Sequence, residues 1–163
     1  MKISEQLEAF LAVLGDWAKQ YGGVAKVAGD KSQLIALLSQ KPGAPRVAIV
    51  FISEVPRGEI NPEDMDRVDR EFWIIVSRGQ GFKQDAGDSL TKGAGGGPPM
   101  FDLVEEARDV ARGVQLDPAT TERPVVYGGM ESFDPEASQS DAYAIKVKIG
   151  TDIGGLTSDQ AEQ

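Results

Sequence analysis

Apolar residues recur every three or four positions over the first twenty residues of the chain. Residues 3–20 place these side chains on one face of a helix and most charged side chains on the other, which predicts an amphipathic helix. Its apolar face consists of Ile3, Leu7, Phe10, Leu11, Leu14 and Ala18. Asp30 stands three positions before Gln33, a capping-box spacing that predicts the start of a second helix. The residues expected to pack from this second helix are Leu34, Ile35, Leu37 and Leu38.

The pattern changes to that of β-strands after residue 45. The segment "RVAIVFIS" at 46–53 is continuously apolar and rich in β-branched residues, which is typical of a strand covered on both faces. Residues 68–77 alternate between two faces, which predicts a second strand whose first half is more exposed to water. The prolines, glycine and charged residues of 54–67 predict a loop between these two strands.

A third helix and two further strands are predicted in the last third of the chain. The helix runs from about Pro99 to Arg112, and Gly113 follows it at a suitable position for a C-terminal cap. Its apolar face is formed by Phe101, Val104, Ala107 and Ala111. The segments "RPVVYGGM" and "DAYAIKVKIG" predict an antiparallel pair of strands joined by the polar tip "ESFDPEASQS". In the last strand we expect inward side chains at Tyr143, Ile145, Val147 and Ile149, and outward ones at Lys146 and Lys148.

These elements predict one α+β domain over residues 1–154. Its sheet is expected to be mixed and mainly antiparallel, with about four to five strands packed against two to three helices. The segment 79–99 is long and rich in glycine and polar residues, so we expect a flexible loop that is either functional or locally disordered. Residues 155–163 have the composition of a mobile C-terminal tail.

Composition argues against most enzyme chemistry. The chain has 163 residues and contains neither cysteine nor histidine, which excludes disulfides, thiolate ligands and every catalytic pair that uses histidine. We therefore expect no enzyme, no catalytic residue, no cofactor and no metal. The net charge of -9 opposes tight binding to a phosphate backbone. No apolar run approaches the length of a membrane span, so no membrane partner is expected.

The segment "TKGAGGGPPMFDL" at 91–103 invites comparison with a phosphate-binding loop. Such a loop needs consecutive backbone N–H groups at the start of a helix. Pro98 and Pro99 have no N–H, and Asp102 places negative charge where a phosphate would lie. Lys92 also precedes the glycines, which is the reverse of the Walker order. We interpret the segment as a loose connection between two elements, with ordering against a partner as the alternative.

Acidic residues are concentrated between 59 and 71, and hard cations prefer several carboxylate oxygens. Arginines at 57, 67 and 70 are interleaved with these acids, and the spacing of a calcium loop is missing. A solvated or interface-facing charged loop is the favoured interpretation, and a small metal- or nucleotide-dependent enzyme using 59–71 is the alternative. Trp73 shares a strand face with Asp69 and Glu71. Core packing is the favoured role for Trp73, and a binding platform at a sheet margin is the alternative.

The order of elements resembles that of one family of viral proteins. The segments that carry the resemblance are "RVAIVFIS", "REFWIIVSRG", "FDLVEEARDVARGV", "PVVYGGMESF" and "DAYAIKVKIGTDIG", in a chain that begins with two helices. Over about residues 3–154 this pattern is similar to the tail terminator and tail completion proteins of long-tailed bacteriophages, including the small tail proteins of Mu-like prophages. The resemblance lies in the pattern and not in an invariant motif.

The resemblance implies a structural protein of the virion. Such proteins form a homohexameric ring that caps the tail tube, stops its elongation and provides the head-docking surface. The implied partners are further copies of the chain, the tail tube protein and the head–tail connector protein, while DNA passes through the lumen without tight binding. The implied location is the head-proximal end of the tail, after assembly in the host bacterial cytoplasm.

The position of the loops 54–67 and 78–99 suggests which residues contact a neighbouring subunit or the tube. These candidates are Arg57, Glu59, Asp64, Asp66, Arg67, Arg78, Lys83 and Lys92. Two other roles remain open beside the tail terminator. One is a head–tail connector or another minor tail protein, and the other is a host adaptor or inhibitor domain.

Overall fold

A computed structural model describes residues 1–38, 44–57, 67–78, 98–114, 116, 125–133 and 142–153. The helices are α1 (Ile3–Gln20), α2 (Lys31–Leu38) and α4 (Met100–Arg112). The strands are β1 (Val24–Val27), β2 (Arg46–Pro56), β3 (Arg67–Ser77), β4 (Val126–Ser132) and β5 (Ala142–Asp152).

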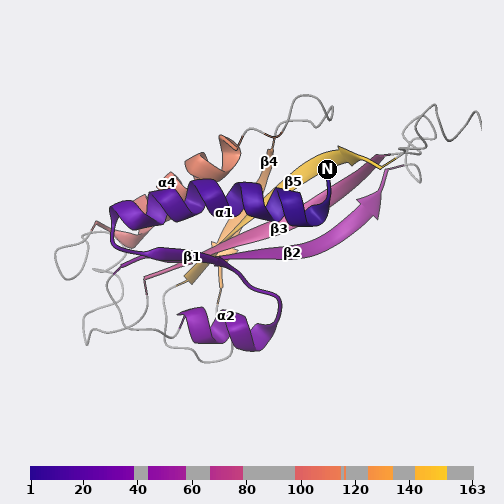
Figure 1. Ribbon diagram of the computed structural model, residues 1–163. Helices are drawn as coiled ribbons and strands as arrows, with labels where there is room; N and C mark the ends of the chain where they lie inside the picture. The colour runs from indigo at the N-terminus through magenta and orange to yellow at the C-terminus, as the bar shows by residue number, and fades with distance from the viewer. Residues whose placement is uncertain are drawn as a thin grey trace, which may run out of the picture.

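The strands form one mixed sheet in the order β1-β2-β3-β5-β4. β1 is parallel to β2, and every other neighbouring pair is antiparallel. Helices α1 and α4 lie side by side on one face of the sheet, and α2 lies on the opposite face (Figure 1). The predicted α+β class and the mainly antiparallel sheet of about five strands are therefore confirmed.

The larger core lies between the sheet and the helices α1 and α4. Phe10, Leu14 and Ala18 of α1 are fully buried there, as the helical spacing predicts. Phe72 of β3 lies at the centre, with its ring centroid 5.4 Å from that of Phe10 and 5.6 Å from that of Phe51. Burying aromatic side chains of this size is a main source of stability in a domain of this length.

The predicted apolar face of α4 is wrong at one position. Phe101 is 40% exposed, and its ring packs edge-on against that of Tyr143 with the ring centroids 5.5 Å apart. Met100 and Leu103 are instead fully buried. The buried set Met100, Leu103, Val104, Ala107 and Ala111 follows the i, i+3, i+4, i+7 spacing of a single stripe. The buried stripe thus keeps Val104, Ala107 and Ala111 and contains Met100 and Leu103 in place of Phe101.

A smaller core lies under α2. Leu34 and Leu37 pack onto the sheet at Ala48, Ile75 and other small residues of the same face. β2 contributes Val47 and Ile49 to the large core and Ala48 to the small one, which confirms that its first half is covered on both faces. The predicted cap of α2 is present, because Gln33 N–H donates to Asp30 Oδ1 at 2.8 Å.

Three strand boundaries differ from the predicted ones. β1 is a strand that the pattern does not predict, and its four residues pair with β2 at the edge of the sheet. β2 extends to Pro56, so the start of the predicted loop 54–67 is strand. β4 extends to Ser132 and takes in the first two residues of the predicted polar tip. At the ends of β2 and β4, pairing with a neighbouring strand overrides a polar local sequence.

The last strand agrees closely with its pattern. Ile145, Val147 and Ile149 are fully buried in the large core, Tyr143 is half-buried against it, and Lys148 is exposed. Lys146 is half-buried. The predicted flexible segment lies outside the described residues over 79–97, as do residues 58–66 of the acidic loop and the predicted tail 155–163.

Candidate functional site

The eight predicted contact residues divide into two groups. Glu59, Asp64, Asp66, Lys83 and Lys92 lie outside the described residues. Arg57, Arg67 and Arg78 are described, and they lie at strand ends. Among the described residues, no group of three or more aspartate, glutamate, histidine or cysteine side chains is placed to hold a metal ion.

Arg57 and Arg67 lie together at one end of the sheet. The N–H of Arg57 donates to the carbonyl of Arg67 at 2.9 Å, which closes the β2–β3 connection at its base. The guanidinium of Arg57 donates to Asp69 Oδ2 at 2.9 Å, and both side chains of this ion pair are one-third exposed. Arg67 stands opposite Asp152 in the β3–β5 ladder. This end thus presents partly exposed charge on ordered strands.

Arg78 lies at the other end of β3 and is only 5% exposed. Its guanidinium donates to the carbonyl of Pro98, the second residue before α4. The Arg78 side chain therefore connects the end of β3 to the residues just before α4, on either side of the segment 79–97. Its described contact lies within the subunit, and its role in contacting a neighbour stays a prediction.

Arg70 is a buried charged residue that does not appear among the candidates chosen by loop position. Its side chain is 7% exposed and lies on the same face of β3 as Phe72. Nε donates to Glu54 Oε1 at 2.8 Å, and one terminal nitrogen donates to the carbonyl of Met1 at 2.7 Å and to Gln6 Oε1 at 3.0 Å. One guanidinium thus connects β2, β3 and the start of α1.

Gln6 extends this network to a third strand. It is fully buried, and its amide nitrogen donates to the hydroxyl of Thr151 on β5 at 2.8 Å. A buried polar group without a partner is costly, so each member of the network holds the others in place. The network fixes the start of α1 over β2, β3 and β5.

A second set of hydrogen bonds connects the two helices of the large core. Glu106 of α4 accepts a hydrogen bond from Tyr21 Oη at 2.5 Å and a longer one from Trp17 Nε1 at 3.4 Å. The hydrogen bond to Glu106 raises the pKa of the Tyr21 hydroxyl, and burial and the negative charges of Glu106 and Asp102 add to this effect. The protonated hydroxyl is therefore the form that the folded protein favours.

Because of the hydrogen bond between Tyr21 and Glu106, we expect the protein to lose stability at alkaline pH. Because the folded-state pKa of Tyr21 lies above 10, the contribution is fully present below about pH 10 and is lost as the pH rises through the folded-state value. Tyr21→Phe should lower the free energy of unfolding by about 1 kcal/mol at pH 7, because solvent weakens this partly exposed bond. Urea unfolding of both proteins at pH 7 and pH 11 should show the difference shrinking at the higher pH; an unchanged difference would contradict the assignment.

Trp73 lies on the sheet face that carries α2 and is half-buried there. Lys146 Nζ lies 4.9 Å from the ring centroid, and Phe133 packs edge-on at 6.4 Å. The indole N–H donates to Glu71 Oε2 at 3.3 Å. Trp73 is therefore packed against the small core on one side and has charged groups beside it on the other. Because β3 is the central strand of the sheet, the expected position at a sheet margin is wrong.

The outermost strand β4 exposes apolar side chains. Val126 is 58% exposed and Tyr127 is 36% exposed, and the guanidinium of Arg108 lies 5.9 Å from the ring centroid of Tyr127. Glu131 lies on the face of β4 opposite to that of Tyr127, where it forms an ion pair with Lys146 at 3.2 Å, and its side chain is 57% exposed. The β4 edge thus presents apolar and acidic groups to solvent.

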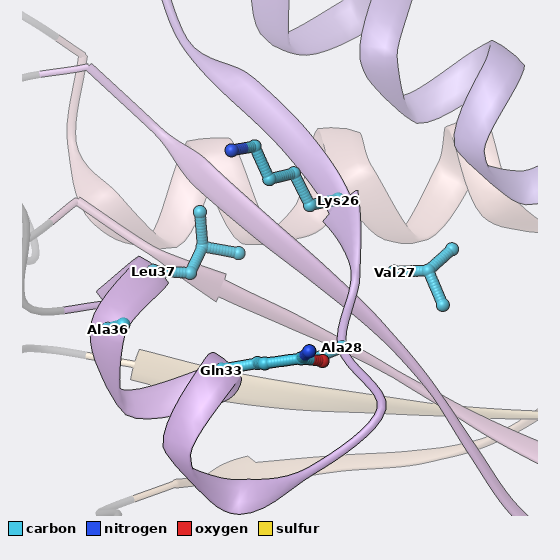
Figure 2. Close-up of a pocket in the computed structure, with 6 residues that line it drawn as sticks. All are labelled: Lys26, Val27, Ala28, Gln33, Ala36 and Leu37. Carbon is cyan, nitrogen blue, oxygen red and sulfur yellow. The ribbon is translucent and has the colours of Figure 1, made fainter.

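The opposite edge of the sheet contains a shallow pocket. It has a volume of about 330 Å³ and lies between β1 and α2. Figure 2 shows Lys26 and Val27 leaving β1 on opposite sides, with Lys26 on the side of α2. The other lining residues are Ala28, Gln33, Ala36 and Leu37. The β1 edge thus presents a positive charge beside an apolar wall.

The described helices include none that is both long and apolar enough to cross a membrane. Comparison of the chain with protein-family models and with curated proteins finds no match.

Proposed function

We propose that this protein is a bacteriophage tail terminator that forms a ring on the end of the tail tube, stops its elongation and provides the surface for head docking. The observation that carries the proposal is the order of elements. Two N-terminal helices, two long antiparallel strands, a helix and a final antiparallel pair follow one another as in the pattern on which the resemblance rests.

Two physical features support a role through shape and self-association. The chain offers neither histidine nor cysteine for chemistry near neutral pH. Its net charge of -9 gives a lumen that repels DNA phosphates on average, which suits a ring through which DNA passes without tight binding. In this proposal the partners are further copies of the chain, the tail tube protein and the head–tail connector protein.

Electron microscopy of the purified protein, alone and mixed with tail tubes of the same phage, tests the proposal. We expect rings on their own or at tube ends, with the tube wall left bare. Persistent monomers that never bind a tube end would contradict it. A labelled copy found on the head side of the joint in complete virions would favour a head–tail connector instead.

A further inference from the structure

The two edges of the sheet carry hydrogen-bonding groups in matching positions. On β4, the N–H of Phe133 donates to the carbonyl of Ala142 at 2.8 Å, so residues at alternate positions from 133 direct their backbone groups toward β5. Met130 and Ser132 therefore direct their N–H and C=O groups away from β5. In the described part of the chain no strand lies on that side.

β1 presents the same arrangement at the other edge. The N–H of Val24 donates to the carbonyl of Pro45 at 3.2 Å, and that of Ala28 donates to Ile49 at 3.0 Å. Ala25 and Val27 therefore direct their backbone groups away from β2. Each edge thus offers two outward residues spaced two apart.

The direction of the strands determines how two copies would join edge to edge. Following the sheet from β1 to β4, the last strand runs opposite to the first. A second copy that continues the sheet beyond β1 therefore brings its β4 alongside in the antiparallel direction. Pairing Ala25 with Ser132 and Val27 with Met130 of the other copy joins all four outward residues.

This register also pairs the side chains well. It places Lys26 directly opposite Glu131, and Val24 opposite Phe133. Lys26 and Glu131 lie on the same sheet face, because their ladder partners Ala48 and Ala144 both belong to the small core under α2. On the other face Val27 meets Met130. A slip of one residue would turn every side chain to the wrong face.

The charges at the two edges are complementary. Lys26 forms no ion pair with any other described residue, and it stands at the rim of the pocket between β1 and α2 (Figure 2). Glu131 is paired with Lys146 of its own subunit, but its side chain is 57% exposed and can accept a second cation. Opposite charges directly across an antiparallel pair stabilise it.

From this match we infer that β4 of one copy adds to β1 of the next, so that the sheet continues from subunit to subunit through a Lys26–Glu131 cross-strand pair. The joint uses different edges of the two copies, and such a head-to-tail contact closes into a ring when the rotation allows. This inference rests on the proposed function, because it identifies the subunit interface through which the ring closes.

The absence of cysteine makes a crosslinking test specific. Lys26→Cys is introduced in one preparation and Glu131→Cys in another, and the two are mixed and oxidised. Directly opposite residues that are not hydrogen-bonded have Cα atoms about 4.5 Å apart, within disulfide range. Within one copy the two positions lie at opposite edges, about 19 Å apart at roughly 4.8 Å per strand spacing.

We expect a disulfide-linked dimer in the mixture at a yield at least tenfold above that of either preparation alone. The matched control is Lys26→Cys mixed with Val126→Cys, which places an exposed thiol on the same face of β4 but out of register. Equal yields at 126 and 131 would overturn the inferred register. A chain carrying both Lys26→Cys and Glu131→Cys should give a ladder of linked copies.

Charge reversal separates this inference from the proposed function. Lys26→Glu should weaken assembly at least tenfold without changing the melting temperature, and adding Glu131→Lys should restore assembly. Rings that form at tube ends without any 26–131 crosslink would overturn the edge pairing and leave the terminator role standing. Crosslinks and rings that form but never bind a tube would overturn the terminator role and support the edge pairing.

Discussion

Arg70→Ala is expected to lower the free energy of unfolding by about 3 kcal/mol, because it leaves the fully buried Gln6 and the Met1 carbonyl without their donor and removes the ion pair with the partly exposed Glu54. The guanidinium supplies hydrogen bonds to Glu54, Gln6 and the carbonyl of Met1. Domains of this size have a total stability of roughly 5 to 15 kcal/mol, so the loss is a large part of it. Chemical denaturation monitored by tryptophan fluorescence measures the change directly.

Arg57→Ala is the matched control for this prediction. Arg57 also forms an ion pair, with Asp69 of β3, but both side chains of this pair are one-third exposed. Its loss should cost less than about 1 kcal/mol. Arg70→Lys should fall between the two, because lysine keeps the charge but cannot reach three acceptors from a planar fork. Equal effects of Arg57→Ala and Arg70→Ala would refute the structural role of the buried network.

Gly23→Ala is expected to destabilise the protein by at least about 2 kcal/mol and to displace β1 from the sheet. A Cβ atom at this position would lie 2.1 Å from the carbonyl oxygen of Pro45 and 3.1 Å from that of Ala18. Both obstacles are backbone atoms, so relief requires moving the chain that joins α1 to β1. Thermal unfolding measures the first effect, and loss of crosslinking through a cysteine at 26 measures the second.

Gly15→Ala is the control with the opposite expected sign. Gly15 lies inside α1, and an added Cβ would meet no atom within 4 Å. Replacing a glycine by alanine in a helix should therefore stabilise the protein by about 0.5 to 1 kcal/mol. If both glycine variants lost stability to the same degree, the close approach of Gly23 to Pro45 would not be the cause.

Hydrophobic periodicity predicted the long elements that bury only one face. The apolar stripe of α1 and the inward side chains of β5 follow from local spacing alone, because burial on one face imposes a regular period. β1 lacks this signal. It has only four residues, and its strand conformation depends on pairing with β2, which a local pattern does not report.

Arg70 shows where a signal was present in the sequence. It occupies an apolar position in the alternation of β3, in line with Phe72 and Ile74, which are fully buried. A charged residue in such a position is buried only when it is paired. The partners could not be found in this way, because Gln6 and Glu54 come from other elements that only the tertiary fold brings together.

The edge residues were missed for a different reason. Lys26 and Glu131 look like ordinary surface charges, and their significance depends on which strands end the sheet. That order places β5 between β3 and β4, which is a consequence of long-range pairing. The candidates selected by loop position fall in part at strand ends, as Arg57 and Arg67 do, and in part outside the described residues.

We propose that this protein acts by assembling on the end of a tail tube. The most direct measurement is the length of tubes polymerised from purified tube protein with this protein added at a few copies per tube end. We expect that elongation stops and that further tube protein does not restore it, with one cap on each arrested end. Tubes of unchanged length, with this protein remaining in the supernatant, would contradict the claim.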